Sequence, residues 1–328
     1  MTLQEEERIR KWNGELSGDI QIRLLVTEDK RTSKFSEFCN NLMRLAPQIR
    51  ITEEKGEAKE PPAIQIGQTV RYHAIPLGTE LEPFLEALSV LDNGFSRIPD
   101  SIRNHLEKNR LPALLKLYVS QQCPFCPVTL RRIIPLPVTN EFIRLAIIDC
   151  ILFPEMAQSD RIQSVPTLLI DEQFRWTGSL QLEELVEVIT NRDPAKLSAS
   201  SLKRMLKEGN ASRVAEMMLD KEILFPAFLD LLMHEKWPVR LGAMVAMEEI
   251  VDRNPELAAQ VIDPLWENFH HVEDPVKGDI IYIFGESGNY EIAPRLETIL
   301  GGQYDTGVKE AAKEALEKIE KKGDRPLL

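Results

Sequence analysis

LKLYVSQQCPFCP, residues 115–127, carries the clearest structural signal in this chain. Its first half belongs to an apolar run of strand length, Leu114–Ser120, and its second half holds two cysteines at C-x-x-C spacing. VTLRRII (128–134) follows directly and can continue as a helix. We therefore expect a strand, a tight turn that carries Cys123 and Cys126, and a helix that begins at that turn.

The segments downstream complete a mixed α/β unit. Short apolar runs of strand length alternate with a short helix or turn, and an amphipathic helix closes the unit. The expected order is β-α-β-α-β-β-α, with the cysteine pair at the first strand-to-helix turn. The segments are FIRLAIID (142–149), FPEMAQSDRI (153–162), TLLID (167–171), QFRWT (173–177) and LQLEELVEVIT (180–190).

Residues 18–91 repeat this pattern, which indicates an internal duplication. Pro62 and Pro166 are 104 positions apart, and each precedes a short apolar strand. In the first copy the position that matches Cys123 falls near Lys30, so the first copy lacks the cysteine pair.

From about residue 198 the apolar residues keep a helical spacing throughout. A short sequence pattern recurs three times, each time before apolar residues at helical spacing. The three copies are WPVR (237–240), DPVK (274–277) and DTGVK (305–309), and their basic residues are 37 and then 32 positions apart. Asp274 suits a helix N-cap before Pro275. A period of this length with two helices per unit predicts an α-solenoid. The predicted fold is therefore α/β followed by all-α, with units at 1–93, 94–192 (which holds the CPFC sequence) and 198–328.

Composition narrows the functional class. Hydrophobic residues make up 43% and charged residues 28% of the 328 residues, as in ordinary soluble proteins. No apolar run approaches the roughly 20 residues of a membrane-spanning helix, and the polar start MTLQEEERIR does not resemble a signal peptide. We expect a cytoplasmic protein without a membrane partner.

The charge distribution argues against nucleic acid as a partner. Residues 201–328 hold 16 Lys and Arg against 24 Asp and Glu, which accounts for −8 of the net charge of −12. A nucleic-acid-binding surface needs clustered basic residues to neutralise phosphates, and the sequence has no basic stripe.

The C-x-x-C spacing predicts a redox-active dithiol. The turn brings both sulfurs within disulfide range, and a cysteine at a helix N-terminus is stabilised as the thiolate. We expect Cys123 to be the nucleophile and Cys126 the resolving thiol of a disulfide exchange. Two residues separate the cysteines: Pro124 has no backbone N–H to donate to the thiolate, and Phe125 adds no charge. We therefore expect a moderately lowered pKa for Cys123.

These residues resemble those of the thioredoxin superfamily. LKLYVSQQCPFCP is followed, 40 residues after Cys126, by SVPTLLID, and CPFC is closest to the glutaredoxin type. The duplication over residues 1–192 is similar to the tandem thioredoxin folds of archaeal protein disulfide oxidoreductases and of the N-terminal domain of the alkyl hydroperoxide reductase flavoprotein. The resemblance implies a cis Val165–Pro166 bond opposite the cysteines, whose backbone would pair with a partner peptide.

Two departures from that family carry consequences. Thioredoxins have a buried Asp six residues before the first cysteine, where this chain has Leu117, so proton transfer from Cys126 needs another group or water. The sequence also shows no flavin- or nicotinamide-binding motif, so we expect no cofactor and an external electron donor such as a flavoprotein of the thioredoxin reductase type. The helical third resembles HEAT repeats, most of which bind proteins.

Other interpretations of the cysteines remain. A zinc site needs about four ligands, and the sequence offers no second C-x-x-C or H-x₃₋₅-H, so we expect no metal. Cys123 and Cys126 can also be an inert pair. Cys39 shares an apolar helical face and fits a core thiol, although a third redox thiol is the alternative. Cys150 fits either packing or a role as a resolving or glutathionylated thiol.

The sequence thus predicts a thiol–disulfide oxidoreductase that acts on a protein disulfide, with a peroxiredoxin among the candidate partners. The alternative is an adaptor that binds proteins through its helical repeats and uses the cysteine pair only for regulation.

Overall fold

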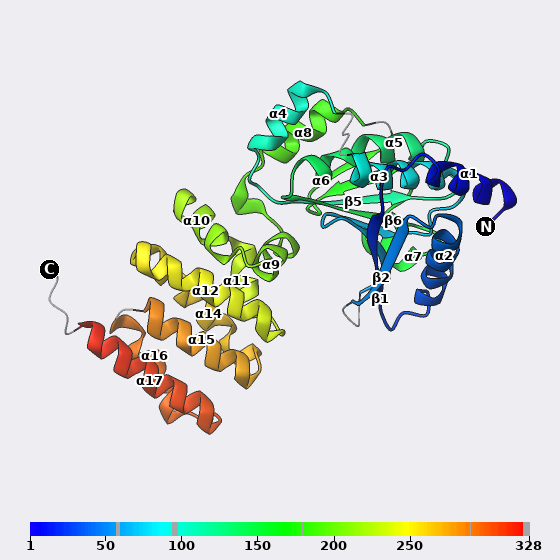
Figure 1. Cartoon of the computed structure of the whole chain (residues 1–328). Helices are drawn as coiled ribbons and strands as arrows, with labels where there is room; N and C mark the ends of the chain where they lie inside the picture. Colours follow the sequence, from blue (N-terminus) through cyan, green and yellow to red (C-terminus); the bar gives the residue numbers. More distant parts are fainter. Residues whose placement is uncertain (57–59, 94–97, 179, 289, 324–328) are drawn as a thin grey trace. The chain divides into compact units, whose positions relative to one another are not determined.

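The computed structural model describes residues 1–56, 60–93, 98–178, 180–288 and 290–323 (Figure 1). The chain divides into two compact units, Met1–Arg192 and Asp193–Leu328. The sequence also predicts a boundary between residues 93 and 94. This boundary adjoins residues 94–97, which lie outside the described residues.

Unit 1, Met1–Arg192, is built on one eight-stranded sheet with strand order β2-β1-β3-β4-β6-β5-β7-β8. The pairs β1–β2, β5–β6 and β4–β6 are parallel, and the hairpins β3–β4 and β7–β8 are antiparallel. The strands are β1 (Ile20–Val26), β2 (Ile49–Lys55), β3 (Ala63–Ile66), β4 (Val70–His73), β5 (Ala113–Val119), β6 (Ile143–Asp149), β7 (Thr167–Ile170) and β8 (Phe174–Thr177).

The sheet order repeats itself, as the duplication predicts. β2-β1-β3-β4 in the first half corresponds to β6-β5-β7-β8 in the second, and the halves join where β4 pairs with β6, with Val70 opposite Leu145. One continuous hydrophobic cluster spans both halves, from Ile9 to Ile189. The two halves therefore share a sheet and a core.

The helices of unit 1 match the apolar periodicity of the sequence with two additions. α3 and α5 pack against each other, and α5 is followed by the short α6, which begins at Pro135 directly after the predicted helix 128–134 (Figure 1). The sequence analysis also missed α1, although Thr2 and Glu5 form a capping box, which is a recognisable helix start. The helices are α1 (Leu3–Asn13), α2 (Thr32–Leu45), η1 (Gly78–Glu80), α3 (Leu81–Asn93), α4 (Asp100–Lys108), α5 (Cys126–Ile133), α6 (Pro135–Thr139), α7 (Pro154–Ser159) and α8 (Leu182–Thr190).

Unit 2, Asp193–Leu328, is helical in its described residues, and α12 packs on α15, which packs on α17 (Figure 1). α12, α15 and α17 begin at the three recurring sequence starts; the HEAT-like solenoid itself stays a prediction. The elements are η2 (Pro194–Lys196), α9 (Ala199–Lys207), α10 (Ala211–Lys221), α11 (Pro226–Leu232), α12 (Trp237–Arg253), α13 (Pro255–Ala259), α14 (Ile262–Asn268), η3 (Phe269–His271), α15 (Asp274–Ser287), η4 (Tyr290–Ile292), α16 (Ala293–Gly301) and α17 (Thr306–Gly323).

An ion pair with a buried arginine joins α12 to α15. The Arg240 guanidinium lies 2.6 Å from the Asp279 carboxylate, and its Nη1 also donates to the carbonyls of His234 and Glu235. The N-cap prediction at Asp274 was wrong by one residue: Glu273 is the N-cap, without a side-chain cap bond, and Asp274 is the first helical residue and pairs with Lys277.

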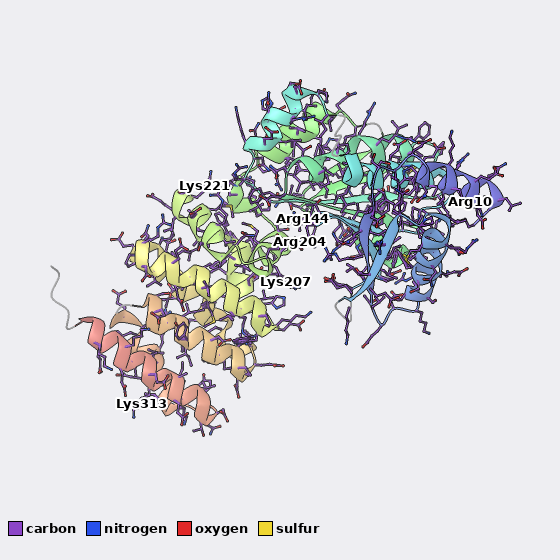
Figure 2. All side chains as sticks on the ribbon, in the orientation of Figure 1. Arg10, Arg144, Arg204, Lys207, Lys221 and Lys313 are labelled. Carbon is purple, nitrogen blue, oxygen red and sulfur yellow. A yellow bond between two sulfur atoms is a disulfide. The ribbon has the colours of Figure 1, made fainter. Side chains whose placement is uncertain are left out.

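Basic side chains come from separate elements of both units, as the labelled residues of Figure 2 illustrate: Arg10 on α1, Arg144 on β6, Arg204 and Lys207 on α9, Lys221 on α10 and Lys313 on α17. Within the described ranges, no helix is both long and apolar enough to cross a membrane.

Candidate redox site

The cysteine pair lies at the turn between β5 and α5, as predicted. β5 ends at Val119, and Cys126 is the first residue of α5. A disulfide joins Cys123 and Cys126, whose Cα atoms are 5.5 Å apart, within the usual disulfide range. The local sequence therefore suffices to bring the two sulfurs together.

The two cysteines differ in environment. Cys123 retains 8% exposure, while Cys126 is fully buried. The backbone N–H of Cys126 donates to the Cys123 sulfur at 3.1 Å, so the first turn of α5 directs a donor at the sulfur that would carry the negative charge of a thiolate. Pro124 is exposed, and the Phe125 side chain is 70% exposed beside the pair.

Val165 and Pro166 lie against the pair, although they are some 40 residues away in sequence. The Val165–Pro166 bond is cis, which confirms the expectation drawn from the family resemblance. The Val165 carbonyl oxygen lies 3.7 Å from the Cys123 sulfur. Val165 lies just before β7, so its backbone faces the cysteine turn directly ahead of the strand.

The first half of unit 1 also reaches the cysteine turn, which the sequence analysis did not foresee. Gln121 donates its side-chain N–H to the Ile75 carbonyl at 2.7 Å, and Thr79 donates its hydroxyl to the Gln121 carbonyl at 2.9 Å. The segment from Ile75 to Glu80, between β4 and α3, therefore belongs to the site.

Glu80 is the second group that the sequence did not reveal. It lies in η1, which packs against α5, and its side chain is fully buried. Neither carboxylate oxygen has a hydrogen-bond partner among the described residues. Burial, and then the charge of Asp149, raise the pKa of Glu80 to about 8. The sequence signal was weak, since a single Glu before the apolar helix 81–91 is ordinary.

The other cysteines lie in environments that disfavour the thiolate. Cys39 is 2% exposed, and burial, followed by the charge of Glu53, raises its pKa to about 12, which fits a core thiol. Cys150 is half-buried, and burial, then Asp149 and Glu80, raise its pKa to about 11. Both thiols are therefore poor nucleophiles at neutral pH.

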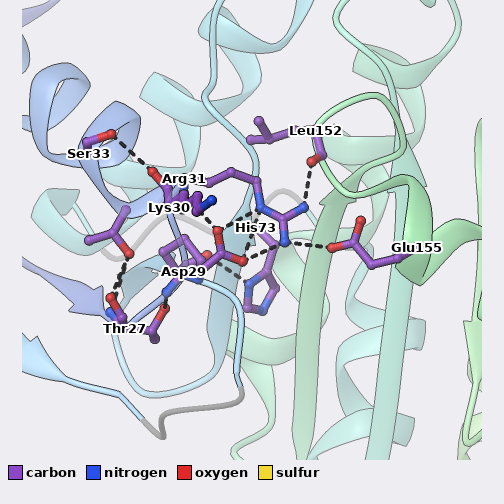
Figure 3. Close-up of polar contacts among 10 residues, drawn as sticks. Thr27, Asp29, Lys30, Arg31, Ser33, His73, Leu152 and Glu155 are labelled. Atoms are coloured by element: carbon purple, nitrogen blue, oxygen red, sulfur yellow. Dashed lines mark hydrogen bonds and ion pairs between the residues drawn. The ribbon is translucent and has the colours of Figure 1, made fainter.

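The corresponding loop in the first half holds an ion-pair cluster in place of cysteines (Figure 3). Arg31 pairs with Asp29 at 2.5 Å and with Glu155 at 2.6 Å, donates to the Leu152 carbonyl at 2.8 Å, and stacks on the Phe153 ring at 4.1 Å. Residues 152–155 belong to the second half. Each half thus packs a segment against the first loop of the other half.

No cluster of three or more His, Cys, Asp or Glu side chains that could hold a metal occurs in the part of the chain that the structure describes.

Comparison with known proteins identifies the domain around the pair. Residues 114–190 match the family model described as a thioredoxin domain. An NADH dehydrogenase of Bacillus subtilis is 22% identical over 176 residues, covering 52% of this chain and 34% of that protein. A component of the alkyl hydroperoxide reductase of Pseudomonas aeruginosa is 21% identical over 202 residues, covering 58% and 38%. The chain thus spans about a third of the length of these relatives.

Solved structures support the fold of the larger region. The N-terminal domain of the alkyl hydroperoxide reductase AhpF from Enterococcus faecalis aligns with a TM-score of 0.51 at 17% identity, covering 58% of this chain and 99% of that one. A protein disulfide oxidoreductase from Aeropyrum pernix aligns with a TM-score of 0.53 at 14% identity, covering 60% and 95%. The chain therefore contains a thioredoxin-family domain at residues 114–190, within a larger α/β region that has the fold of these two structures.

Proposed function

We propose that this protein is a thiol–disulfide oxidoreductase that acts on a protein partner through Cys123 and Cys126. The observation that carries the proposal is the disulfide at the start of α5, with the Cys126 N–H directed at the Cys123 sulfur. The thiolate is the reactive form of cysteine, and a helix N-terminus favours it.

The proposed exchange proceeds in two steps that balance. The reduced Cys123 thiolate attacks a disulfide of the partner, forms a mixed disulfide and releases one partner thiolate. Cys126 then attacks the Cys123 sulfur, releases the second partner thiol, and leaves the disulfide Cys123–Cys126. A second dithiol must return two electrons and two protons, and we propose a flavoprotein of the thioredoxin reductase type as its source.

The proposed peptide-binding surface is the backbone of Val165 and Pro166. A partner segment that lies beside Cys123 in extended form can pair with the Val165 backbone, as in a short β-bridge. The exposed Pro124 and Phe125 border the same sulfur. A protein substrate fits this arrangement, and an oxidised peroxiredoxin is the first candidate because the Pseudomonas aeruginosa relative is named as a subunit of an alkyl hydroperoxide reductase. We place this reaction in the cytoplasm.

We propose Glu80 as the proton acceptor for Cys126. Cys126 is fully buried, so its proton must pass to an internal group before the sulfur can attack. Glu80 is buried in η1 against α5, and a pKa of about 8 is close to that of a thiol, so transfer between them is nearly balanced. It would take the role of the Asp that is absent at Leu117.

The direct test is a redox titration together with turnover. Thiol alkylation across a dithiothreitol series should show one two-electron transition at about −180 to −270 mV, and the full chain should reduce many equivalents of insulin disulfide. Cys123→Ser should abolish both, while Cys150→Ser, which changes a half-buried cysteine outside the pair, should keep both. A pair that never forms a disulfide would contradict the proposal.

One observation favours the second candidate, a protein-binding adaptor. Trp237, Leu241 and Val245 lie four residues apart along α12 and are 56%, 40% and 46% exposed, which makes an apolar stripe of the kind that protein partners cover. An adaptor should bind its partner equally well after Cys123→Ser and show no turnover of insulin disulfide.

A further inference from the structure

Thr79 comes from the half of unit 1 that has no cysteine pair, and it contacts the loop that carries Cys123. Its hydroxyl lies 2.9 Å from the Gln121 carbonyl oxygen and 3.4 Å from the Cys123 carbonyl oxygen. Its backbone N–H also points at the Gln121 carbonyl, at 3.5 Å. The Thr79 hydroxyl thus lies within hydrogen-bond distance of two carbonyls of the cysteine turn.

The segment around Thr79 is held in place from two sides. The Gly78 N–H donates to the Glu5 carboxylate at 2.8 Å, and Gln121 returns a hydrogen bond to the Ile75 carbonyl at 2.7 Å. Gly78 has a φ of +61°, and a Cβ there would lie 3.2 Å from the Gln121 carbonyl oxygen. The close approach and the left-handed conformation both favour glycine, which lets Thr79 reach the loop.

The position of this hydroxyl bears on the redox equilibrium. The carbonyl oxygens of Gln121 and Cys123 carry partial negative charge close to the sulfur that becomes a thiolate. A hydroxyl donated to them offsets part of that charge, which favours the thiolate and so the reduced pair. A more stable reduced pair means a higher reduction potential.

We propose that Thr79 is a positioning residue for the redox site: its hydroxyl holds the Cys123 loop and raises the reduction potential of the Cys123–Cys126 pair. This inference rests on the proposed function. It gives the cysteine-free half of unit 1 a specific part in the reaction, acting through two backbone carbonyls.

The test is a redox titration of the full chain carrying Thr79→Val, which removes the hydroxyl and keeps the shape. We expect the dithiol–disulfide equilibrium to move by about three- to tenfold toward the disulfide, where tenfold corresponds to about 30 mV for two electrons. The pH midpoint of Cys123 alkylation should move upward, and Thr79→Ser should restore both values.

Thr190→Val is the matched control, because the Thr190 hydroxyl donates to the Val186 carbonyl at 2.9 Å within α8, outside the cysteine loop. It should leave the potential unchanged. If Thr79→Val does not fold, the comparison of Thr79→Ala with Thr79→Ser takes its place. An unchanged potential in the variants without the hydroxyl, or an equal shift in Thr79→Ser, would overturn the proposal.

The outcome separates this inference from the proposed function. The titration needs no partner protein, so a wild-type chain that fails to reduce insulin would leave the effect of Thr79→Val on the potential measurable. A purely structural role would lower the thermal unfolding midpoint of Thr79→Val without moving the potential, and that result also overturns the proposal.

Discussion

At the scale of single residues, the site combines groups that the sequence could reveal with groups that it could not. Cys123 and Cys126 are recognisable because their spacing, the strand before them and the helix after them are local. Glu80 and Thr79 are 43 and 44 positions before Cys123 and have no local motif. Only the packing of η1 against α5 makes them part of the site.

The buried carboxyl of Glu80 makes stability depend on pH. Its pKa of about 8 lies above the value of 4.5 for an exposed Glu, so between these pH values the unfolded chain binds fewer protons than the folded chain, and stability falls as the pH rises. Glu80→Gln mimics the protonated form and should remove this loss. In urea unfolding from pH 5 to 8, the free energy of unfolding of the variant should rise relative to that of the wild type by up to about 1.4 kcal/mol per pH unit.

Glu82→Gln is the control for that series, because Glu82 lies at the start of α3, two residues after Glu80, with 56% side-chain exposure. Its stability curve should run parallel to that of the wild type. Parallel curves for Glu80→Gln as well would mean that Glu80 is not held neutral in the folded protein.

At the scale of elements, the end of α8 is fixed to the sheet by a buried ion pair. Arg192 pairs with Asp171, which follows β7, and donates to the Pro112 carbonyl just before β5. Both side chains are nearly inaccessible, at 5% and 2% exposure. Burial lowers the pKa of Arg192 to about 10, because desolvation disfavours its charged form.

Arg192→Met should therefore destabilise the chain by about 3–5 kcal/mol, because it leaves the Asp171 carboxylate buried without its cation. Denaturant unfolding followed by circular dichroism measures this. Arg213→Met, which breaks the exposed pair with Glu216 on α10, should cost about 0–1 kcal/mol. Equal costs for the two substitutions would show that the buried pair contributes no more than a surface pair.

At the scale of the whole molecule, the chain consists of two compact units, each with its own buried residues. The redox groups described above all lie in Met1–Arg192. We therefore expect a fragment of residues 1–192 to fold and to keep the redox midpoint of the full chain within about 15 mV, which is a factor of about three in the equilibrium constant.

The measurement compares the alkylation titrations of the fragment and the full chain. A fragment with Cys123→Ser, which should show no transition, serves as the control. A fragment that folds but titrates at a clearly different potential would assign part of the redox behaviour to Asp193–Leu328. Loss of insulin turnover with an unchanged potential would instead assign substrate capture to that unit.

The sequence alone determined the strands, most helices and the cysteine turn, because these depend on apolar periodicity, proline positions and the spacing of neighbouring residues. It also revealed the duplication, since Pro62 and Pro166 each precede a short apolar strand. The tertiary structure decided that both halves share one sheet, that Val165 lies beside the Cys123 sulfur, that Thr79 contacts the cysteine loop, and that Glu80 is buried in η1 against α5. These contacts join residues about 40 positions or more apart. They arise from long-range packing, which no local sequence pattern predicts.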